Sequence, residues 1–272
     1  MLAGSPVERL RPRSTGRLLD GGFEVLRFRP GQIVAVLGVT WLPVYVLTRF
    51  IGDPGRIMSW VWTEVWHGLS KRSRYDHWIG PAFPKWAILG SLVMLLCEML
   101  TGIGVAFLVT SWVRGADPTS RQTLQQIWRR IPAATLTWLM ALVVKIASFA
   151  LFGIGLMMTA PMLAVLAPVV ASEQHRPVAS LRRCFELTRT SRNMVQGLYL
   201  LPPIIGLVIN SSVHLADQSG LLPIPLLTSV LAALLVAALT AWRAAVWALT
   251  YANTRVATEG LDLRLEMARV MP

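Results

Sequence analysis

The stretch that decides the fold is IPAATLTWLMALVVKIASFALFGIGLMMTAPMLAVLAPVVAS, residues 131–172, in which Lys145 is the only charged residue. A helix needs about 20 apolar residues to cross the hydrocarbon core of a bilayer. The stretch is therefore long enough for two spans, and Gly153-Ile154-Gly155 at its midpoint can supply the reversal between them. Runs this apolar are not typical of barrel strands, so the pattern predicts a polytopic membrane protein with helical spans.

The composition also favours a membrane protein. Hydrophobic residues make up 54% of the 272 residues and charged residues 15%, whereas an average soluble domain has about 25% charged residues. The net charge is +12, but the basic residues lie in short segments between apolar runs. We therefore expect contacts with anionic lipid headgroups at the inner face of the membrane and no nucleic-acid partner. Cys97 and Cys184 fit no disulfide or metal pattern, and no cofactor is expected.

The apolar runs predict an all-α fold with six transmembrane helices in a single integral membrane domain, residues 1–272. We place the spans at residues 32–48, 86–112, 132–152, 154–171, 194–215 and 222–250. The remaining long segments are expected to be a basic cytoplasmic tail with an interfacial helix, a Trp-rich loop outside the membrane and a second cytoplasmic tail, at residues 1–30, 52–85 and 252–272.

The distribution of basic residues predicts the orientation. With the N-terminus inside, the inner segments carry 18 arginines and the outer segments carry 6 basic residues, all in the first outer loop. Both termini are therefore expected in the cytoplasm of a multi-pass protein. Arginine outnumbers lysine by 23 to 3, which together with much Ala, Leu and Val favours a bacterial source with a GC-rich genome, and hence the bacterial plasma membrane.

Three inner segments share one pattern before the first, third and fifth spans. They begin near Ser14, Ser120 and Ser180, hydroxyl residues suited to a helix N-cap, and continue with apolar residues three or four apart. This pattern predicts basic amphipathic helices at the inner interface and three repeats of interfacial helix plus helical hairpin. The alternative is that any cytoplasmic loop between spans tends to be basic and amphipathic. The candidate contacts with anionic lipid are Arg17, Arg27, Arg29, Arg129, Arg130, Arg182, Arg183, Arg189 and Arg192.

Two opposite charges are predicted near the same depth in the membrane. Glu98 lies in the second span and Lys145 in the third, and antiparallel neighbours would bring them together. We predict a buried pair, which serves either as a structural ion pair or as part of a path for protons or substrate. Arg243, near the inner end of the sixth span, is expected to snorkel to the headgroups or to contact a lipid phosphate.

The fifth span contains the adjacent prolines Pro202 and Pro203. Two missing backbone donors predict a kinked or unwound helix, which marks a binding site in some transporters and is also common in ordinary membrane helices. Asn210 on the same span would line a polar path or bond to a neighbouring helix.

Several stretches resemble a bacterial family, the glycerophosphoryl diester phosphodiesterase membrane domain family. The resemblance lies in residues 11–20 with Phe23, in residues 167–170 with Glu173, in residues 180–187, and in the tail, residues 251–256 and 259–263. In some proteins of this kind the membrane domain is joined to a catalytic barrel with a His-Arg-Gly motif. Here His175-Arg176 is followed by Pro177, and a chain with six spans has no room for a barrel of about 250 residues. The resemblance therefore implies a stand-alone membrane domain without the phosphodiesterase activity.

Two functions of different classes are compatible with these patterns. The first is a non-enzymatic membrane subunit or scaffold for envelope or lipid-related machinery, with a protein partner in a membrane complex. The alternative is a transporter or lipid-translocating protein with a polar path near Glu98, Lys145 and the Pro-containing fifth helix. No nucleophile–base constellation selects an enzyme.

Overall fold

The computed structural model describes residues 14–44, 85–150, 154–173, 176–218 and 225–259. Within these ranges the chain is all-helical and has no strand. The elements are α1 (Thr15–Phe28), α2 (Pro30–Thr40), α5 (Lys85–Val113), α6 (Ser120–Phe149), α7 (Ile154–Met162), the 3-10 turn η3 (Leu163–Val165), α8 (Leu166–Ser172), α9 (Pro177–Arg189), α10 (Arg192–Gln218) and α11 (Pro225–Glu259).

Four of these helices contain stretches long and apolar enough to cross a membrane, counting η3 with its flanking helices. The stretches are Leu92–Val113, Ser120–Phe149, Gly155–Ser172 and Leu234–Glu259. The apolar helix α2 is shorter, with 11 residues in the described part of the chain. The expectation of a helical membrane protein is met at this level, and the count of six spans is not confirmed within the described residues. The Trp-rich loop expected at residues 52–85 lies almost entirely outside the described residues.

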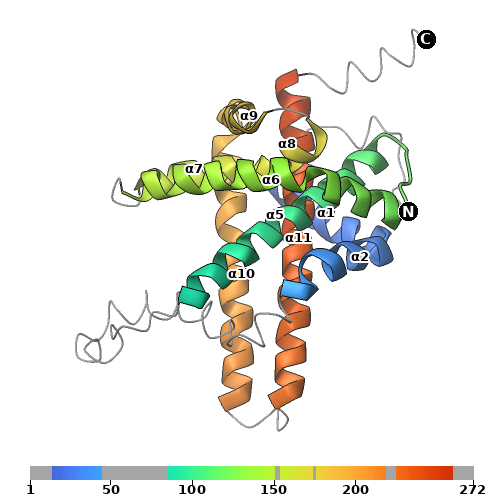
Figure 1. Ribbon diagram of the computed structural model, residues 1–272, viewed down its shortest axis with the longest axis vertical. Helices are drawn as coiled ribbons and strands as arrows, with labels where there is room; N and C mark the ends of the chain where they lie inside the picture. Colours follow the sequence, from blue (N-terminus) through green and yellow to red (C-terminus); the bar gives the residue numbers. More distant parts are fainter. Residues whose placement is uncertain (1–13, 45–84, 151–153, 174–175, 219–224, 260–272) are drawn as a thin grey trace.

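Helix α11 forms the centre of the arrangement. It packs most extensively against α5 and next against α1, and it also contacts α8, α9 and α10. Figure 1 shows α10 and α11 side by side along the long axis, with α6 running across them. The molecule is therefore not a simple bundle of parallel and antiparallel spans.

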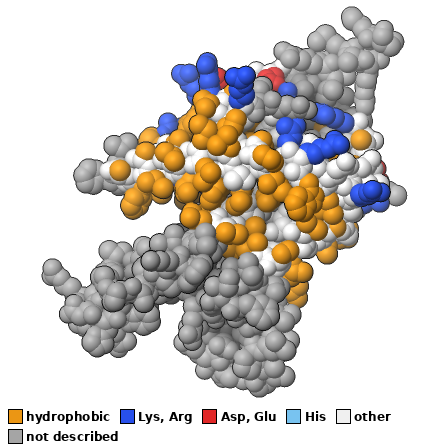
Figure 2. All heavy atoms as spheres, in the orientation of Figure 1, with side chains coloured by type: hydrophobic (Ala, Val, Ile, Leu, Met, Phe, Trp, Pro, Cys, Tyr) orange, Lys and Arg blue, Asp and Glu red, His pale blue; other side chains and the backbone are white. Residues whose placement is uncertain are grey.

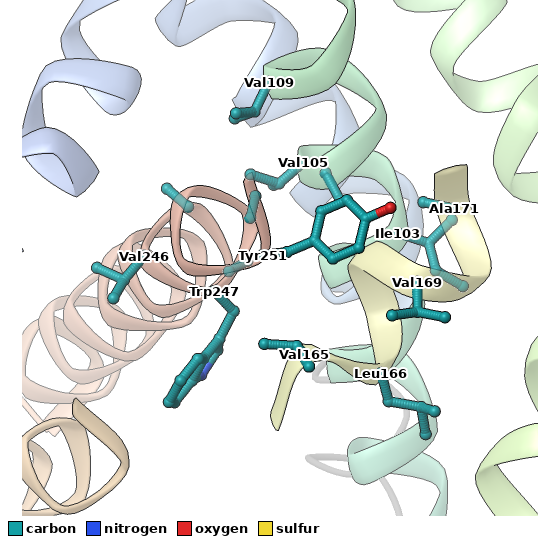
Figure 3. Packing of buried hydrophobic residues seen from close by; sticks show 14 of the residues in the cluster. Ile103, Val105, Val109, Val165, Leu166, Val169, Ala171, Val246, Trp247 and Tyr251 are labelled. Atoms are coloured by element: carbon teal, nitrogen blue, oxygen red, sulfur yellow. The ribbon is translucent and has the colours of Figure 1, made fainter. Parts of the chain in front are cut away.

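Among the described residues, the centre of the core is built from apolar side chains of α5, α8 and α11, and the other helices add buried residues around it. Figure 3 shows the Tyr251 ring of α11 among Ile103, Val105 and Val169, with its hydroxyl oxygen directed toward α8. Close approach of the helices uses glycine, because a Cβ on Gly102 would lie 2.7 Å from the Ala167 Cβ. The absence of a side chain at Gly102 therefore allows α5 and α8 to pack this closely.

The expected reversal between two apolar helices is confirmed. Helix α6 ends at Phe149, α7 begins at Ile154, and the two pack against each other. A Cβ on Gly155 would lie 2.5 Å from the backbone oxygen of Ser148. The turn therefore requires the glycine, which has no Cβ to clash with the preceding helix.

The structure does not reproduce one repeating unit. A separate interfacial helix was expected before the third span, but α6 is continuous from Ser120 through Pro132. Its N-cap is Thr119, whose side chain accepts from the Gln122 backbone N–H while the Gln122 side chain accepts from the Thr119 N–H. This capping box places the N-terminus of α6 in the loop before the apolar run. The expected interfacial helix and the span that follows it are therefore one continuous helix.

Other boundaries also differ from the expectation. Helix α9 begins at Pro177 with Arg176 as N-cap, so Ser180 lies inside the helix and is buried. Helix α11 extends to Glu259, so the first eight residues of the expected tail at 252–272 are helical. No proline or glycine occurs between Arg243 and Glu259 to end the helix earlier.

Candidate functional site

The ion pair within the apolar helices joins Glu98 to Arg243, not to Lys145. The Arg243 guanidinium on α11 contacts the Glu98 carboxylate on α5, and the side chains are 32% and 24% exposed. The prediction of a Glu98–Lys145 pair is therefore wrong. The prediction assumed that Glu98 of the second span faces the third span. Because α5 packs more extensively on α11 than on α6, Glu98 pairs with a residue of α11 instead.

Lys145 nevertheless belongs to the same cluster. It is half-buried on α6 and lies within electrostatic range of both Glu98 and Arg243. Tyr199 of α10 is also within range of the pair, and its ring packs on Trp247, one turn beyond Arg243, with 6.3 Å between ring centroids. The structure thus places Arg243 with Glu98, and Lys145 within electrostatic range of both, whereas the sequence pattern predicted only a pair of Glu98 and Lys145.

The fifth helix is not unwound at its two prolines. Helix α10 remains α-helical through Pro202 and Pro203, with Pro202 buried. The chain is interrupted instead between α7 and α8, where η3 replaces a turn of α-helix after Pro161. Asn210 lies on α10, but its side chain is outside the described part of the structure.

A second cluster of charges lies where α8, α9 and the end of α11 meet. The Tyr251 hydroxyl donates to Glu173 Oε1 at 2.7 Å and accepts from Arg255 Nη1 at 3.2 Å. Arg183 Nε of α9 donates to Glu173 Oε2 at 2.9 Å, and its Nη2 contacts Glu259. Arg255 also donates from Nε to Glu259 Oε2 at 2.9 Å. We call these five residues the α9 clamp.

The α9 clamp balances its own charges. It contains two carboxylates and two guanidinium groups, whose side chains are 10–23% exposed. Ser172 extends it, with Oγ 2.6 Å from the Tyr251 hydroxyl oxygen and 2.7 Å from the Pro168 carbonyl oxygen. Because ion pairs with this little solvent are sensitive to the loss of one partner, the α9 clamp holds α9 in a defined orientation.

The electrostatics of Glu173 follow from these contacts. Burial alone would raise its pKa, but hydrogen bonds from Tyr251 and Arg183 and the charges of Arg183 and Arg255 outweigh burial. The pKa of Glu173 therefore lies below its ordinary value. The carboxylate is the charged centre of the α9 clamp at neutral pH.

Each of the amphipathic helices α1 and α9 packs one apolar face against the rest of the protein. On α9 the buried residues include Leu181, Cys184 and Leu187, and on α1 they include Leu18 and Val25. Packing inside the molecule thus satisfies part of the amphipathic pattern, while Phe23 of α1 and Val178 of α9 are exposed. The expected position of these helices at the membrane interface stays a prediction. Burial also raises the pKa of the Cys184 thiol above its ordinary value.

The predicted lipid-contact arginines fall into three groups. Arg183 turns inward into the α9 clamp, so it is wrong as a lipid contact. Arg130 and Arg192 are half-buried. The exposed members are Arg17, Arg27, Arg29, Arg129, Arg182 and Arg189, of which Arg29 pairs with Asp117 and Arg182 with Glu186. Figure 2 shows basic side chains gathered at the end of the molecule where α9 lies, above a band of hydrophobic side chains.

Four members of the α9 clamp were not predicted as site residues from the sequence: Glu173, Tyr251, Arg255 and Glu259. Charge pattern alone placed Glu173 in an inner loop and the other three residues around the start of the second cytoplasmic tail, with no reason to meet. The signal that pointed to them was the family resemblance, whose quoted stretches contain all four and also Arg183. In the structure these separate stretches converge on one cluster.

Comparisons with known proteins identify no relative of this chain. No family model, no curated protein and no solved structure matches it. The resemblance to the membrane domain family therefore remains a prediction. Among the residues that the structure describes, no group of three His, Cys, Asp or Glu side chains is arranged to hold a metal ion.

Proposed function

We propose that this chain is a multi-pass protein of the bacterial plasma membrane that acts as a non-enzymatic subunit or scaffold, with both termini in the cytoplasm. The proposal includes six spans, with α2 and α10 added to the four helices already long and apolar enough to cross. Helix α2 covers part of the first span expected at residues 32–48, and α10 has the length of a span.

The observation that carries the proposal is the α9 clamp. It fixes a surface helix on the end of the molecule through Arg183, while α9 exposes Arg182 and Arg189 on an adjacent face and Arg176 at its N-cap. A helix held this way presents a rigid basic face, which suits docking to anionic headgroups or to a partner more than it suits turnover of a substrate.

The charge distribution supports the orientation. The inner segments hold 18 of the 26 basic residues if the termini are cytoplasmic. The α9 face and the start of α6 would then lie on the cytoplasmic side, where anionic lipid is available to Arg129 and Arg189.

The test is purification from the native membrane under mild conditions, followed by native mass spectrometry. We expect a protein partner in fixed stoichiometry, and its loss when Arg182 and Arg189 are both changed to Glu. The matched control is Arg17→Glu on α1, which reverses an exposed charge away from α9. A chain that is isolated alone from its native membrane, or a partner retained equally by both variants, would contradict the proposal.

Orientation is tested separately with single cysteines in a background of Cys97→Ser and Cys184→Ser. A cysteine at Arg189 should react with a membrane-impermeant maleimide only after the inner face is opened. A cysteine at Ser70 in the expected outer loop should react in intact cells. The reverse pattern would place the termini outside.

A further inference from the structure

Helix α6 presents one continuous exposed face along its length. Its buried residues, which include Thr123, Ala134 and Ala141, lie on one side of the helix. On the other side, exposed positions recur every three or four residues from Arg121 to Ile146. Because this spacing keeps side chains on one face of a helix, the exposed positions form a single stripe, which we call the α6 outer face.

The chemistry of the α6 outer face changes once along the helix. The exposed basic residues Arg121 and Arg129 lie in its first part. Trp128 lies at the end of that part and is 65% exposed. From residue 132 to residue 149 every exposed side chain is apolar. Since an indole ring favours the level of the lipid headgroups, this order follows the change from water to hydrocarbon at a membrane surface.

The apolar part of the α6 outer face is long enough to cross the hydrocarbon core. Trp128 and Phe149 are 21 positions apart, about 32 Å along the helix axis. The hydrocarbon core is about 30 Å thick. With Trp128 at the inner membrane surface, the rest of the face lies at the depth of the acyl chains.

Arg121 and Arg129 are free to bind an anion. Helix α6 contains no Asp or Glu between Ser120 and Phe149, and no ion pair or side-chain hydrogen bond joins either guanidinium group to the residues that the structure describes. Other exposed arginines, Arg29 and Arg182, each pair with a carboxylate. Two guanidinium groups without a carboxylate, at the edge of an apolar surface, complement the phosphate and the acyl chains of a phospholipid.

We propose that the α6 outer face binds anionic phospholipid of the inner leaflet. Arg129 donates hydrogen bonds to the headgroup phosphate beside Trp128, and the acyl chains lie along Leu136 and Leu139. Arg121 is about 12 Å farther from the apolar part along the helix axis, and its charge attracts the anionic headgroup. The inference rests on the proposed function for the membrane placement and the cytoplasmic side, and it names the lipid class. It does not involve α9.

The experiment measures which lipids touch the α6 outer face. A bimane fluorophore is attached to Leu136→Cys in full-length protein with Cys97→Ser and Cys184→Ser, in nanodiscs that contain brominated phosphatidylglycerol or brominated phosphatidylcholine. Leu136 lies about 10 Å beyond Arg129 along the axis, at the depth of bromines in the middle of an acyl chain. We expect both lipids to quench the fluorophore, with a preference for phosphatidylglycerol of about fivefold in relative affinity.

Charge variants test the origin of this preference. The double variant Arg121→Gln/Arg129→Gln should remove it, and Arg121→Lys/Arg129→Lys should retain it, because lysine keeps the positive charges. Arg17→Gln on α1 is the matched control, since it removes an exposed charge from another helix. A fluorophore on Val208→Cys, an exposed apolar position of α10, should be quenched equally by the two lipids.

The outcomes separate this inference from the proposed function. Equal quenching by both lipids at Leu136, or a preference that survives Arg121→Gln/Arg129→Gln, would overturn the headgroup site and leave the membrane placement intact. Quenching at Val208 but not at Leu136 would overturn it as well, because protein would then cover the α6 outer face. Absence of quenching at both positions would contradict the membrane placement itself.

Discussion

Tyr251 is the residue at which the polar and apolar parts of the molecule meet. Its side chain is 1% exposed, its ring packs among core residues of α5 and α8 (Figure 3), and its hydroxyl contacts Glu173 and Arg255. A phenol fits this position because one end is apolar and the other accepts and donates hydrogen bonds. Phenylalanine would fill the same space, but Glu173 and Arg255 would lose their hydrogen bonds with the hydroxyl.

Replacing Tyr251 with Phe should therefore destabilise the protein without creating a cavity. Hydrogen bonds to charged groups contribute about 1.5–3 kcal/mol, and we expect a loss of that size in thermal or denaturant unfolding. Tyr199→Phe is the control, since the Tyr199 hydroxyl has no hydrogen bond within the described residues. Equal stability of Tyr251→Phe and wild type would show that the α9 clamp contributes nothing through this hydroxyl.

Glu173 should make stability depend on pH. Its pKa is lowered below 4.5 in the folded protein, so its contribution is fully present above the unfolded value and is lost as pH falls through the folded pKa. We expect unfolding temperatures to fall as the pH is lowered below about 5, and to fall less in Glu173→Gln. Identical pH profiles for the two proteins would mean that the carboxylate is not stabilised by the α9 clamp.

At the scale of elements, α9 depends on the α9 clamp for its position. The reactivity of Cys184 on the buried face of α9 can test this dependence, because Cys184 is fully buried and its thiol pKa is raised by burial. In a Cys97→Ser background we expect slow maleimide labelling of Cys184, and labelling at least tenfold faster in Arg183→Ala. Arg182→Ala is the control, since Arg182 is 83% exposed and pairs only along the helix with Glu186. Equal labelling rates in both variants would show that Arg183 does not hold α9 in place.

Helix α1 packs on α11 through a glycine. A Cβ on Gly22 would lie 2.7 Å from Val246 Cγ2 and 2.9 Å from Trp242 Nε1. We expect Gly22→Ala to loosen α1 and to accelerate tryptic cleavage at Arg17 and Arg27. Gly16→Ala on the same helix meets nothing within 4 Å, and should stabilise α1 by up to about 1 kcal/mol. The opposite ranking of the two variants would refute this packing.

At the scale of the whole molecule, apolar side chains remain on the outside. Leu136, Leu139, Val143, Ile146 and Phe149 form an exposed stripe along α6, between 45% and 65% exposed. They recur every three or four residues, so they share one face of the helix. Water would not tolerate a surface this apolar, and lipid is the solvent that does.

We therefore expect Val143→Asp to impair membrane insertion. A charge at the centre of a spanning helix costs about 2.5–3.5 kcal/mol on insertion scales. The measurement is the fraction of protein resisting alkaline carbonate extraction, with Val143→Leu as the control that keeps the surface apolar. Resistance that is unchanged in Val143→Asp would mean that this face of α6 does not contact lipid.

The lipid environment and the helical secondary structure could be predicted from the sequence. Long uncharged runs exclude water-facing surfaces, and residues 131–172 are long enough that only two helices and a reversal at Gly153–Gly155 accommodate them. The structure agrees, with α6 ending before this turn and α7 beginning within it. Such information is local, since it depends on the hydropathy and conformational freedom of neighbouring residues.

The pairing of charges was decided only by the tertiary structure. Hydropathy places Glu98, Lys145 and Arg243 within spans but contains nothing about which helix faces which. Because α5 packs closely on α11, Glu98 pairs with Arg243, and Lys145 lies within electrostatic range of both. The α9 clamp likewise joins residues 78 positions apart, Glu173 and Tyr251. Sequence alone determined which segments leave water, because burial of apolar groups is a property of each segment. The partners of their charges depend on contacts between segments, which only the folded chain creates.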